Sequence, residues 1–216
     1  MNLVFLGPPG SGKGTQAKRL AEKLSLPHIS VGDLLRIEVQ QGTVTGKNIK
    51  AIMEAGNLVP DEVTIELTRN RIIQPDCAKG FILDGFPRNV VQAEALDAML
   101  EKENIILSKV VYFDIAKDQI VSRLSGRRSC RKCGAVYHIK FNPPKNEGIC
   151  DKDGGELYQR ADDEENSIRT RFDVYNNQTQ VLIERYKKVK KLVTVDAGKE
   201  INQVYADLLL AIKYGN

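Results

Sequence analysis

Short runs of apolar residues alternate along this chain with longer segments in which apolar residues recur at helical spacing. The apolar runs lie at residues 3–6, 80–83, 110–113 and 192–195, and a shorter one lies at 28–31. Helical spacing covers residues 13–24, 33–41, 46–55, 61–73, 90–102, 117–125, 163–189 and 200–213. Runs that are apolar on both faces suit the strands of a parallel sheet with helices on either side. The pattern therefore predicts an α/β fold with a central parallel sheet.

The alternation breaks between residues 126 and 162. Glycine, proline, cysteine and aspartate crowd this stretch, as at 142–144 (Asn-Pro-Pro) and 153–155 (Asp-Gly-Gly), and no apolar helix face can be drawn through it. A chain of 216 residues has room for one substantial core and an inserted module. We therefore expect residues 126–162 to form a separate small module within one main domain.

Charge and hydropathy argue against several classes of protein. The 32 basic residues nearly balance the 28 acidic ones, and a net charge of +4 does not by itself indicate a nucleic-acid partner. No apolar stretch approaches the roughly 20 residues that span a bilayer, and the first apolar run ends at once in Gly-Pro-Pro, unlike a secretory signal. We expect a soluble cytoplasmic protein, in which cysteines stay reduced and serve better as metal ligands than as disulfides.

A glycine-rich loop joins the first apolar run to the first helical segment. Residues 7–15 read Gly-Pro-Pro-Gly-Ser-Gly-Lys-Gly-Thr. In this setting the loop N–H groups, the helix N-terminus and Lys13 form a cradle for nucleotide phosphates, whereas the alternative is an ordinary turn. A P-loop NTPase normally has Ser or Thr directly after the lysine to bind magnesium, but here Gly14 follows and Thr15 comes one residue later. The predicted ATP-binding residues of this loop are Gly10, Ser11, Gly12, Lys13, Gly14 and Thr15.

Asp84 stands at the end of the apolar run at 80–83, where the acidic residue of a nucleotide site reaches toward the phosphates. Because Gly14 offers no hydroxyl, we expect Asp84 to organise magnesium largely through metal-bound water, which suits an ion that dehydrates reluctantly. The alternative is a simple turn residue at a strand end.

Three cysteines and an aspartate have the spacing of two metal-binding knuckles. Cys130, Cys133, Cys150 and Asp153 form the pattern C-x2-C-x16-C-x2-D, and a glycine follows each pair. Three thiolates and one carboxylate suit a closed tetrahedral zinc site with a structural role. His138 is the competing fourth ligand, and reduced cysteines without metal are another alternative. A zinc ribbon that binds nucleic acid would be a different class of protein, but residues 126–163 carry nearly balanced charge and few aromatics.

Four motifs in order resemble the adenylate kinase family over essentially the whole chain. They are the loop at 7–15, Gly-Asp-Leu-Leu-Arg at 32–36, Asp-Gly-Phe-Pro-Arg at 84–88, and Gly-Arg-Arg at 126–128. The resemblance implies reversible, magnesium-dependent transfer of the terminal phosphoryl group of ATP to AMP, giving two ADP, by a monomer. Another nucleoside monophosphate kinase or a GTP:AMP phosphotransferase is the alternative.

The same resemblance implies a P-loop nucleoside monophosphate kinase fold in three parts. The core is residues 1–29, 60–125 and 164–216, the acceptor-binding helical segment is 30–59, and a small zinc-ribbon-like lid is 126–163. A lid excludes water, a competing phosphoryl acceptor, and structural zinc keeps so small a segment folded.

Arginine is the residue type this chemistry requires most, because several phosphates gather at one site and guanidinium binds their oxygens bidentately. By resemblance, Arg36 and Arg88 hold the AMP phosphate, and Arg123 and Arg127 approach the ATP phosphates. Arg160 and Arg171 bridge both nucleotides. Each of them, taken alone, has a solvated surface arginine as its alternative. The predicted catalytic set is Lys13, Arg88, Arg123, Arg160, Asp162, Asp163 and Arg171.

Asp162 and Asp163 have two interpretations. The resemblance gives them a role in holding the closed lid and orienting arginines. With Glu164 and Glu165 they also read as an acidic first turn of the following helix.

The resemblance also assigns contacts with the nucleosides. Val136 and Tyr137 face the ATP base or ribose, and Lys199 contacts adenine through its backbone. Besides Arg36, Arg88, Arg160 and Arg171, the predicted AMP-binding residues are Val31, Asn57, Leu58, Val59, Gly85, Phe86, Pro87 and Gln92. Val31 departs from the family, in which many members carry Thr, so a polar contact with the acceptor is lost there.

Overall fold

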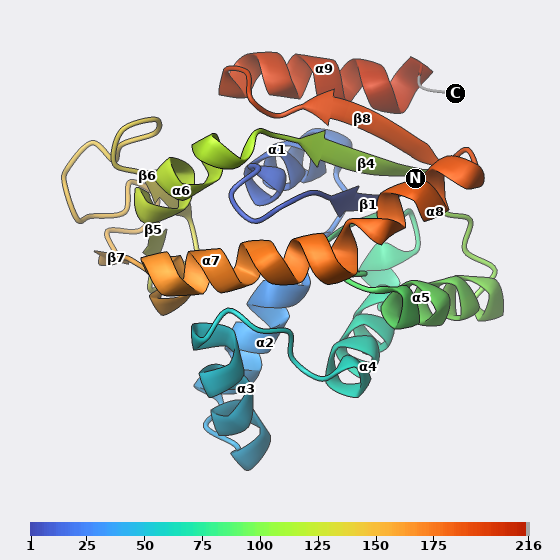
Figure 1. Ribbon diagram of the computed structural model, residues 1–216, viewed down its shortest axis with the longest axis horizontal. Coiled ribbons are helices and arrows are strands. Elements are labelled where there is room, and N and C mark those ends of the chain that lie inside the picture. Colours follow the sequence, from blue (N-terminus) through green and yellow to red (C-terminus); the bar gives the residue numbers. More distant parts are fainter. Residues whose placement is uncertain (215–216) are drawn as a thin grey trace.

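A five-stranded, wholly parallel sheet forms the centre of the molecule (Figure 1). The computed structural model describes residues 1–214, apart from the side chains of residues 44, 45 and 214. The strands are β1 (Asn2–Leu6), β2 (His28–Ser30), β3 (Phe81–Asp84), β4 (Lys109–Asp114) and β8 (Leu192–Asp196), in the spatial order β2-β3-β1-β4-β8. The predicted α/β fold with a central parallel sheet is thereby confirmed.

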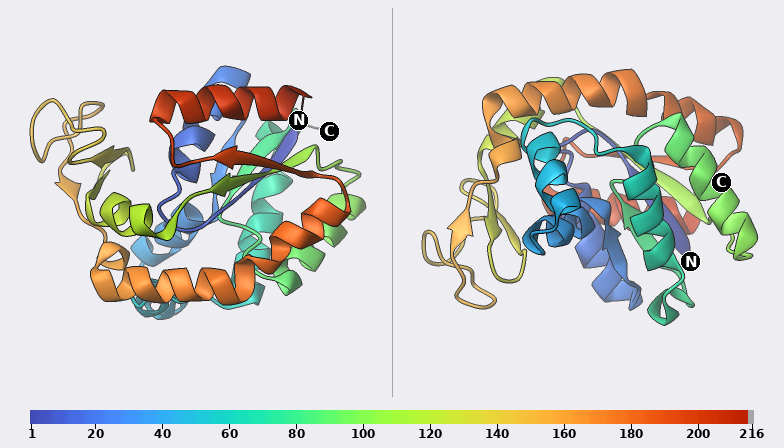
Figure 2. Two further views of the ribbon diagram at one scale, coloured as in Figure 1. Left: turned by 45° about the horizontal axis from the view of Figure 1, so that its top comes forward. Right: turned by 90° about the horizontal axis from the view of Figure 1, so that it is seen from below.

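Helices cover both faces of this sheet (Figure 2). The helices of the described residues are α1 (Lys13–Leu24), α2 (Val31–Gln40), α3 (Val44–Glu54), α4 (Asp61–Ile72), α5 (Val90–Lys102), α6 (Lys117–Ser125), α7 (Glu165–Val174), α8 (Val181–Lys188) and α9 (Ile201–Tyr214). Single 3-10 turns lie at Pro75–Cys77 and Ala161–Asp163. Within the described residues, no helix is both long and apolar enough to cross a membrane.

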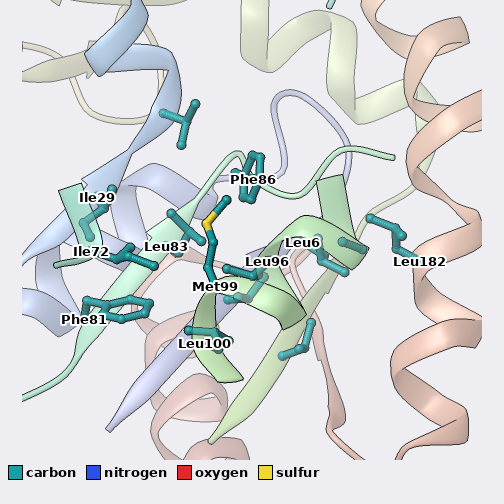
Figure 3. Packing of buried hydrophobic residues seen from close by; sticks show 14 of the residues in the cluster. Leu6, Ile29, Ile72, Phe81, Leu83, Phe86, Leu96, Met99, Leu100 and Leu182 are labelled. Carbon is teal, nitrogen blue, oxygen red and sulfur yellow. The ribbon is translucent and has the colours of Figure 1, made fainter. Parts of the chain in front are cut away.

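Successive residues of β1 contribute to two separate cores, as the alternation of side chains along a strand requires. Val4 and Leu6 belong to a cluster with Leu96 of α5 and Leu182 of α8, which Figure 3 shows from close by. Leu3 and Phe5 belong to the cluster on the opposite face, which includes residues of α1 and α9. Every position of the strand from Leu3 to Leu6 is at most 3% exposed, which explains its unbroken apolar sequence.

Side-chain caps fix where several helices begin. The Ser30 hydroxyl accepts from the N–H of Asp33, so α2 starts at Val31, two residues before the predicted start. The strand in the apolar run at 28–31 therefore ends at Ser30, and Val31 already belongs to α2. Asn89 caps α5 in the same way by accepting from the N–H of Gln92.

The prediction of a single long helix over residues 163–189 is wrong in two respects. A π-helical turn at Tyr175–Thr179 separates α7 from α8, and α7 begins only at Glu165 after the 3-10 turn. Apolar residues keep helical spacing on each side of the π turn, so periodicity in the sequence does not show the extra residue.

A second, three-stranded antiparallel sheet lies inside the segment that interrupts the alternation. Its strands are β5 (Arg127–Cys130), β6 (Val136–His138) and β7 (Leu157–Tyr158), in the order β6-β5-β7. Its own buried cluster is small and consists of Cys130, Ala135, Tyr137, Cys150 and Leu157. In Figure 1 this sheet lies to one side beside α6, while α2 and α3 extend below the central sheet.

Candidate functional site

One large cavity opens at the carboxyl ends of the parallel strands, where α/β sheets commonly bind ligands. Its volume is about 820 Å³, toward the upper end of the roughly 300–1,000 Å³ typical of ligand pockets. The glycine-rich loop lines it, together with α2, the segment after α3, the loop after β3, the small sheet, α7 and the loop after β8. Segments far apart in sequence therefore meet around a single space.

The glycine-rich loop wraps around the Lys13 ammonium. Lys13 Nζ donates to Gly7 O at 2.7 Å, to Pro8 O at 2.9 Å and to Ser11 Oγ at 3.3 Å. Burial lowers the pKa of Lys13 to about 8 despite the nearby Asp84 carboxylate, and nearby arginines lower it further. A Cβ on Gly7 would come within 2.6 Å of the Phe113 carbonyl oxygen, so the loop lies too close to β4 for a larger residue. The predicted loop residues Gly10, Ser11, Gly12, Lys13, Gly14 and Thr15 all line the cavity.

Asp84 lies directly against the loop. The parallel register pairs Asp84 with Phe5, the penultimate residue of β1. Burial raises the pKa of Asp84, but His28 Nε2, 3.4 Å from Asp84 Oδ2, and the Lys13 charge outweigh it, so the net pKa is lowered. A Cβ at Gly14 would lie only 3.3 Å from Asp84 Oδ2. Glycine at this position therefore gives the carboxylate room as well as removing a hydroxyl.

The six predicted arginines all line the same cavity. Arg36 Nη2 lies 2.6 Å from Asp33 Oδ1, and although burial raises the pKa of Asp33, Arg36 lowers it to about 2. Arg160 Nε donates to Ser129 Oγ at 2.8 Å, and Arg123 Nη1 donates to Ala197 O at 2.9 Å. Arg36 thus has an acidic partner, whereas these bonds of Arg160 and Arg123 are to neutral oxygens.

Several of these guanidinium groups have a lowered pKa, because they are withdrawn from water and lie near other cations. Burial and the nearby Arg171 lower the pKa of Arg88 to about 10. Burial, with Arg127 and Arg36 close by, lowers the pKa of Arg160 to about 10 as well. Both groups remain cationic at neutral pH, so this part of the cavity favours a strongly anionic ligand.

Asp163 is the anionic centre of the arginine cluster. Its side chain is fully buried and accepts from Arg127 Nε at 2.7 Å, Arg127 Nη2 at 2.5 Å and Arg171 Nη1 at 3.2 Å. Asp162 contacts Arg171 at 3.0 Å. Asp163 precedes α7 and is bonded to arginines rather than to the first turn of that helix, which supports the interpretation that it orients arginines.

On the acceptor side, most predicted residues line the cavity. They are Val31, Asn57, Leu58, Val59, Gly85, Pro87 and Gln92. Gly56 fixes this segment against α7, since a Cβ there would lie 2.7 Å from Ser167 O. Gln92 is 1% exposed; its amide nitrogen donates to Asp61 Oδ1 at 2.8 Å and its amide oxygen accepts from Arg88 N at 2.7 Å.

Phe86 is the exception on the acceptor side. It is fully buried in the core cluster (Figure 3). It is not part of the cavity wall. A large apolar ring between Gly85 and Pro87 packs inward and anchors the loop, so the side chain of Phe86 does not face the cavity.

The residues predicted to contact the nucleoside of ATP differ in where their side chains point. Val136 and Tyr137 line the cavity, but the Tyr137 hydroxyl donates to or accepts from Cys150 Sγ at 3.5 Å and accepts from Asp151 N at 2.9 Å. The phenol end of Tyr137 is therefore turned toward the cysteines. Lys199 also lines the cavity, and its ammonium pairs with Asp207 at 2.7 Å, which leaves its backbone as the group to consider for binding.

The cysteine cluster assembles as its spacing predicts. One ligand atom each from Cys130, Cys133, Cys150 and Asp153 lie within 4.8 Å of one another. Cys133 Sγ and Cys150 Sγ are 3.6 Å apart, near the about 3.8 Å edge of a zinc tetrahedron with bonds of about 2.3 Å. Backbone N–H groups of Lys132 and Cys133 point at Cys130 Sγ. The residues present fit a tetrahedral zinc ion.

His138, the alternative fourth ligand, is bonded elsewhere. Its Nδ1 accepts from the N–H groups of Lys140 and Phe141, and its Nε2 lies 3.2 Å from Ser122 O. The four residues that lie together therefore include Asp153 and not His138. Cys77 does not belong to this cluster; it is buried elsewhere, and its sulfur accepts from Arg71 Nη1.

Sequence reasoning missed three residues that line the cavity or hold its arginines. His28 faces Asp84 from β2, Asp33 pairs with Arg36, and the Thr179 hydroxyl donates to Arg88 O at 2.6 Å. The pairing of β2 with β3 could have indicated His28. The spacing of three residues between Asp33 and Arg36 in the Gly-Asp-Leu-Leu-Arg motif could have indicated Asp33. No sequence pattern indicates Thr179, which depends on the π turn.

Comparison with known proteins agrees with these observations. A family model described as adenylate kinase matches residues 5–191. Similar proteins include the adenylate kinases of Methanocella arvoryzae, 54% identical over 213 residues covering 99% of each chain, and of Archaeoglobus fulgidus, 52% identical over 208 residues covering 96% of each. The adenylate kinase of Clostridioides difficile is 48% identical over 215 residues, or 100% of each chain.

Proposed function

The chain belongs to the adenylate kinase family, an enzyme family that transfers the terminal phosphoryl group of ATP to AMP, and from this premise we propose how its residues perform that transfer. One observation carries the proposal. A single cavity has the phosphate loop at one end, the α2–α3 segment at the other, and half-buried arginines between them.

The donor nucleotide binds at the loop end. Its phosphates replace the carbonyl partners of Lys13 and accept from the N–H groups of residues 10–15, whose glycine backbone permits close approach. Arg123 and Arg127 contact the same phosphates. Val136, Tyr137 and the Lys199 backbone lie beside the base or ribose.

The acceptor nucleotide binds at the opposite end. Arg36 and Arg88 hold its phosphate, and Val31, residues 57–59, Gly85 and Gln92 enclose the nucleoside. Val31 is 1% exposed and belongs to the apolar core cluster, so it contributes backbone and packing rather than a hydroxyl. Part of the specificity for AMP therefore depends on backbone groups.

Transfer needs no protein nucleophile. An oxygen of the acceptor phosphate attacks the terminal phosphorus of the donor, a new P–O bond forms, and the bond to the bridging oxygen breaks with its electrons leaving on ADP. Arg160 and Arg171 span the two phosphate groups, and Lys13 neutralises charge on the donor end. Since these cations are already desolvated and fixed, the charge of the transition state is stabilised without reorganising water.

Magnesium fits beside Asp84. Its carboxylate, whose net pKa is lowered, faces the space that Gly14 leaves open, and Mg²⁺ bound there would neutralise phosphate charge. Asp84 would hold the ion through water, in keeping with the lack of a hydroxyl at position 14.

Zinc fits the four-residue cluster of Cys130, Cys133, Cys150 and Asp153, and its role there is structural. All four positions of the tetrahedron are taken by protein, which leaves none for substrate. The five buried side chains of the small sheet make a weak core, so zinc would supply much of its stability.

We also propose the division into a core (1–29, 60–125 and 164–216), an acceptor-binding segment (30–59) and a lid (126–163). The α2–α3 pair and the three-stranded sheet fall within the last two. We further propose that the chain acts as a monomer, as the family resemblance implies.

A nucleotide panel tests the assignment. Purified protein is given ATP or GTP with AMP, CMP, UMP or GMP, and diphosphate products are separated and quantified. The proposal expects AMP with ATP to be used at least tenfold more efficiently than any other pair. Equal use of CMP or UMP, or preference for GTP, would instead support another nucleoside monophosphate kinase or a GTP:AMP phosphotransferase. Val31→Thr is the matched variant for the effect of the missing hydroxyl on acceptor KM.

A further inference from the structure

A π turn interrupts the long helix beside the cavity. The N–H of Gln180 donates to Tyr175 O at 3.0 Å, a hydrogen bond across five residues where an α-helix spans four. Such a turn adds one residue to the helix and is found frequently at functional sites. The added residue changes which side chains face the cavity.

The change can be estimated from helix geometry. An α-helix advances about 100° per residue, so in an unbroken helix Arg171 and Thr179 would lie about 80° apart around the axis. One added residue reduces this angle to about 20°. Arg171, Tyr175 and Thr179 indeed all line the cavity. The π turn therefore places the Thr179 hydroxyl on the same side as Arg171.

The Thr179 hydroxyl meets the loop after β3. Its Oγ1 donates to Arg88 O at 2.6 Å, and the residue is 8% exposed. Arg88 is also held by two further hydrogen bonds: its backbone N–H donates to Gln92 Oε1 at 2.7 Å, and its Nε donates to Gly85 O at 2.8 Å. Hydrogen bonds thus hold both backbone polar groups of Arg88 and the base of its guanidinium.

A half-buried arginine among other cations needs such support. Arg171 and Arg36 lie close enough to disfavour the Arg88 charge, and repulsion of this kind moves a flexible side chain away from its neighbours. Fixed backbone at Arg88 keeps the guanidinium near the other arginines before any phosphate arrives. Preorganisation of this kind lowers the cost of binding the anion.

We propose that Thr179 is a positioning residue for Arg88, brought into place by the π turn at Tyr175–Thr179, and that it tunes binding of the acceptor phosphate. The inference rests on the proposed role of Arg88 at the acceptor phosphate. It also connects two arginines of the cavity, because α7 carries Arg171 and the π turn that follows α7 holds the loop of Arg88.

The first experiment compares Thr179→Val, which removes only the hydroxyl from a side chain of the same shape, with Thr179→Ser, which keeps it. Steady-state kinetics are measured well below the melting temperature. We expect Thr179→Val to lower kcat/KM for AMP about tenfold, with KM for ATP changed less than twofold, and Thr179→Ser to restore most of the loss. Thr194→Val, at an exposed position of β8 that is not part of this cavity wall, is the matched control and should change neither. A purely structural role would lower the melting temperature of Thr179→Val and leave its kinetics for AMP unchanged, which would overturn the proposal.

The second experiment asks whether Thr179 acts through Arg88. AMP affinity is measured by titration for Thr179→Val, Arg88→Lys and the double variant, with melting curves for each. If Thr179 acts through Arg88, its substitution should weaken binding less than twofold in the Arg88→Lys background. If the two substitutions weaken AMP binding additively in the double variant, the positioning role of Thr179 is refuted while the role of Arg88 stands. An Arg88→Lys variant that binds AMP normally would refute the role of Arg88 as well.

Discussion

Asp163→Asn is the substitution that most directly tests how the arginine cluster is held together. The side chain of Asp163 is fully buried and that of Arg127 is 18% exposed, so the ion pair between them has little contact with water. Arg127 begins the small sheet and Asp163 follows its end, while Arg171 lies on α7. The carboxylate therefore fastens both ends of residues 126–163 to the long helix.

The expected loss follows from these contacts. Asparagine keeps one oxygen acceptor but replaces the other oxygen with an N–H donor, so the charge and at least one of the two hydrogen bonds from Arg127 are lost. Breaking a buried pair by removing one partner costs about 3–5 kcal/mol. For a chain of this size each kcal/mol lowers the melting temperature by about 2–4 °C, which gives a fall of roughly 6–20 °C.

Differential scanning calorimetry without nucleotide measures this loss. Asp162→Asn is the first control, because that carboxylate is 16% exposed and, within the described part of the chain, forms an ion pair with Arg171 only, so we expect a smaller fall. Asp173→Asn, an exposed position on α7, should change the free energy of unfolding by less than about 0.5 kcal/mol. The reasoning is refuted if Asp163→Asn melts within 2 °C of the unmodified protein or no lower than Asp162→Asn.

Three further predictions concern the phosphate loop and the metal sites. Gly14→Thr adds a Cβ 3.3 Å from Asp84 Oδ2, so we expect turnover with magnesium to fall at least tenfold while ATP binding without magnesium changes much less; unchanged turnover would exclude crowding of Asp84. Lys13, with its pKa lowered to about 8, should take up a proton when ATP binds above pH 8, so ATP affinity should fall with rising pH by at most tenfold per unit. Calorimetry at pH 8.5 in two buffers of different ionisation enthalpy should detect this uptake in the unmodified protein but not in Lys13→Met. Chelation of zinc should lower the melting temperature and leave turnover at low temperature intact, whereas loss of turnover with an unchanged melting curve would contradict a structural ion.

The sequence predicts the central sheet well because its strands are short and apolar on both faces. β1 contributes alternate residues to two cores, which leaves no polar position from Leu3 to Leu6. The phosphate loop and the cysteine cluster were also predictable, since each depends on residue types at fixed spacing. Residues 126–162 lacked any helical pattern, but strands of two to four residues are too short to be recognised by alternation.

What the sequence did not show depends on tertiary packing. Phe86 was expected at the ligand because its neighbours are, yet the loop turns its ring into the core. The π turn adds one residue within a continuous helical pattern, and only the fold reveals that Thr179 then reaches Arg88. The choice between two interpretations of Asp163 likewise depended on a contact with Arg127, 36 residues away in sequence.

The central claim is that one cavity brings two nucleotides together for direct transfer. The most direct measurement follows ATP, AMP, ADP and inorganic phosphate together by chromatography, for the unmodified protein and for Lys13→Met. The account predicts two ADP formed for each pair of ATP and AMP consumed, no release of phosphate, and loss of turnover in a Lys13→Met protein that remains folded. Release of phosphate with AMP unchanged, or near-normal turnover of Lys13→Met, would contradict it.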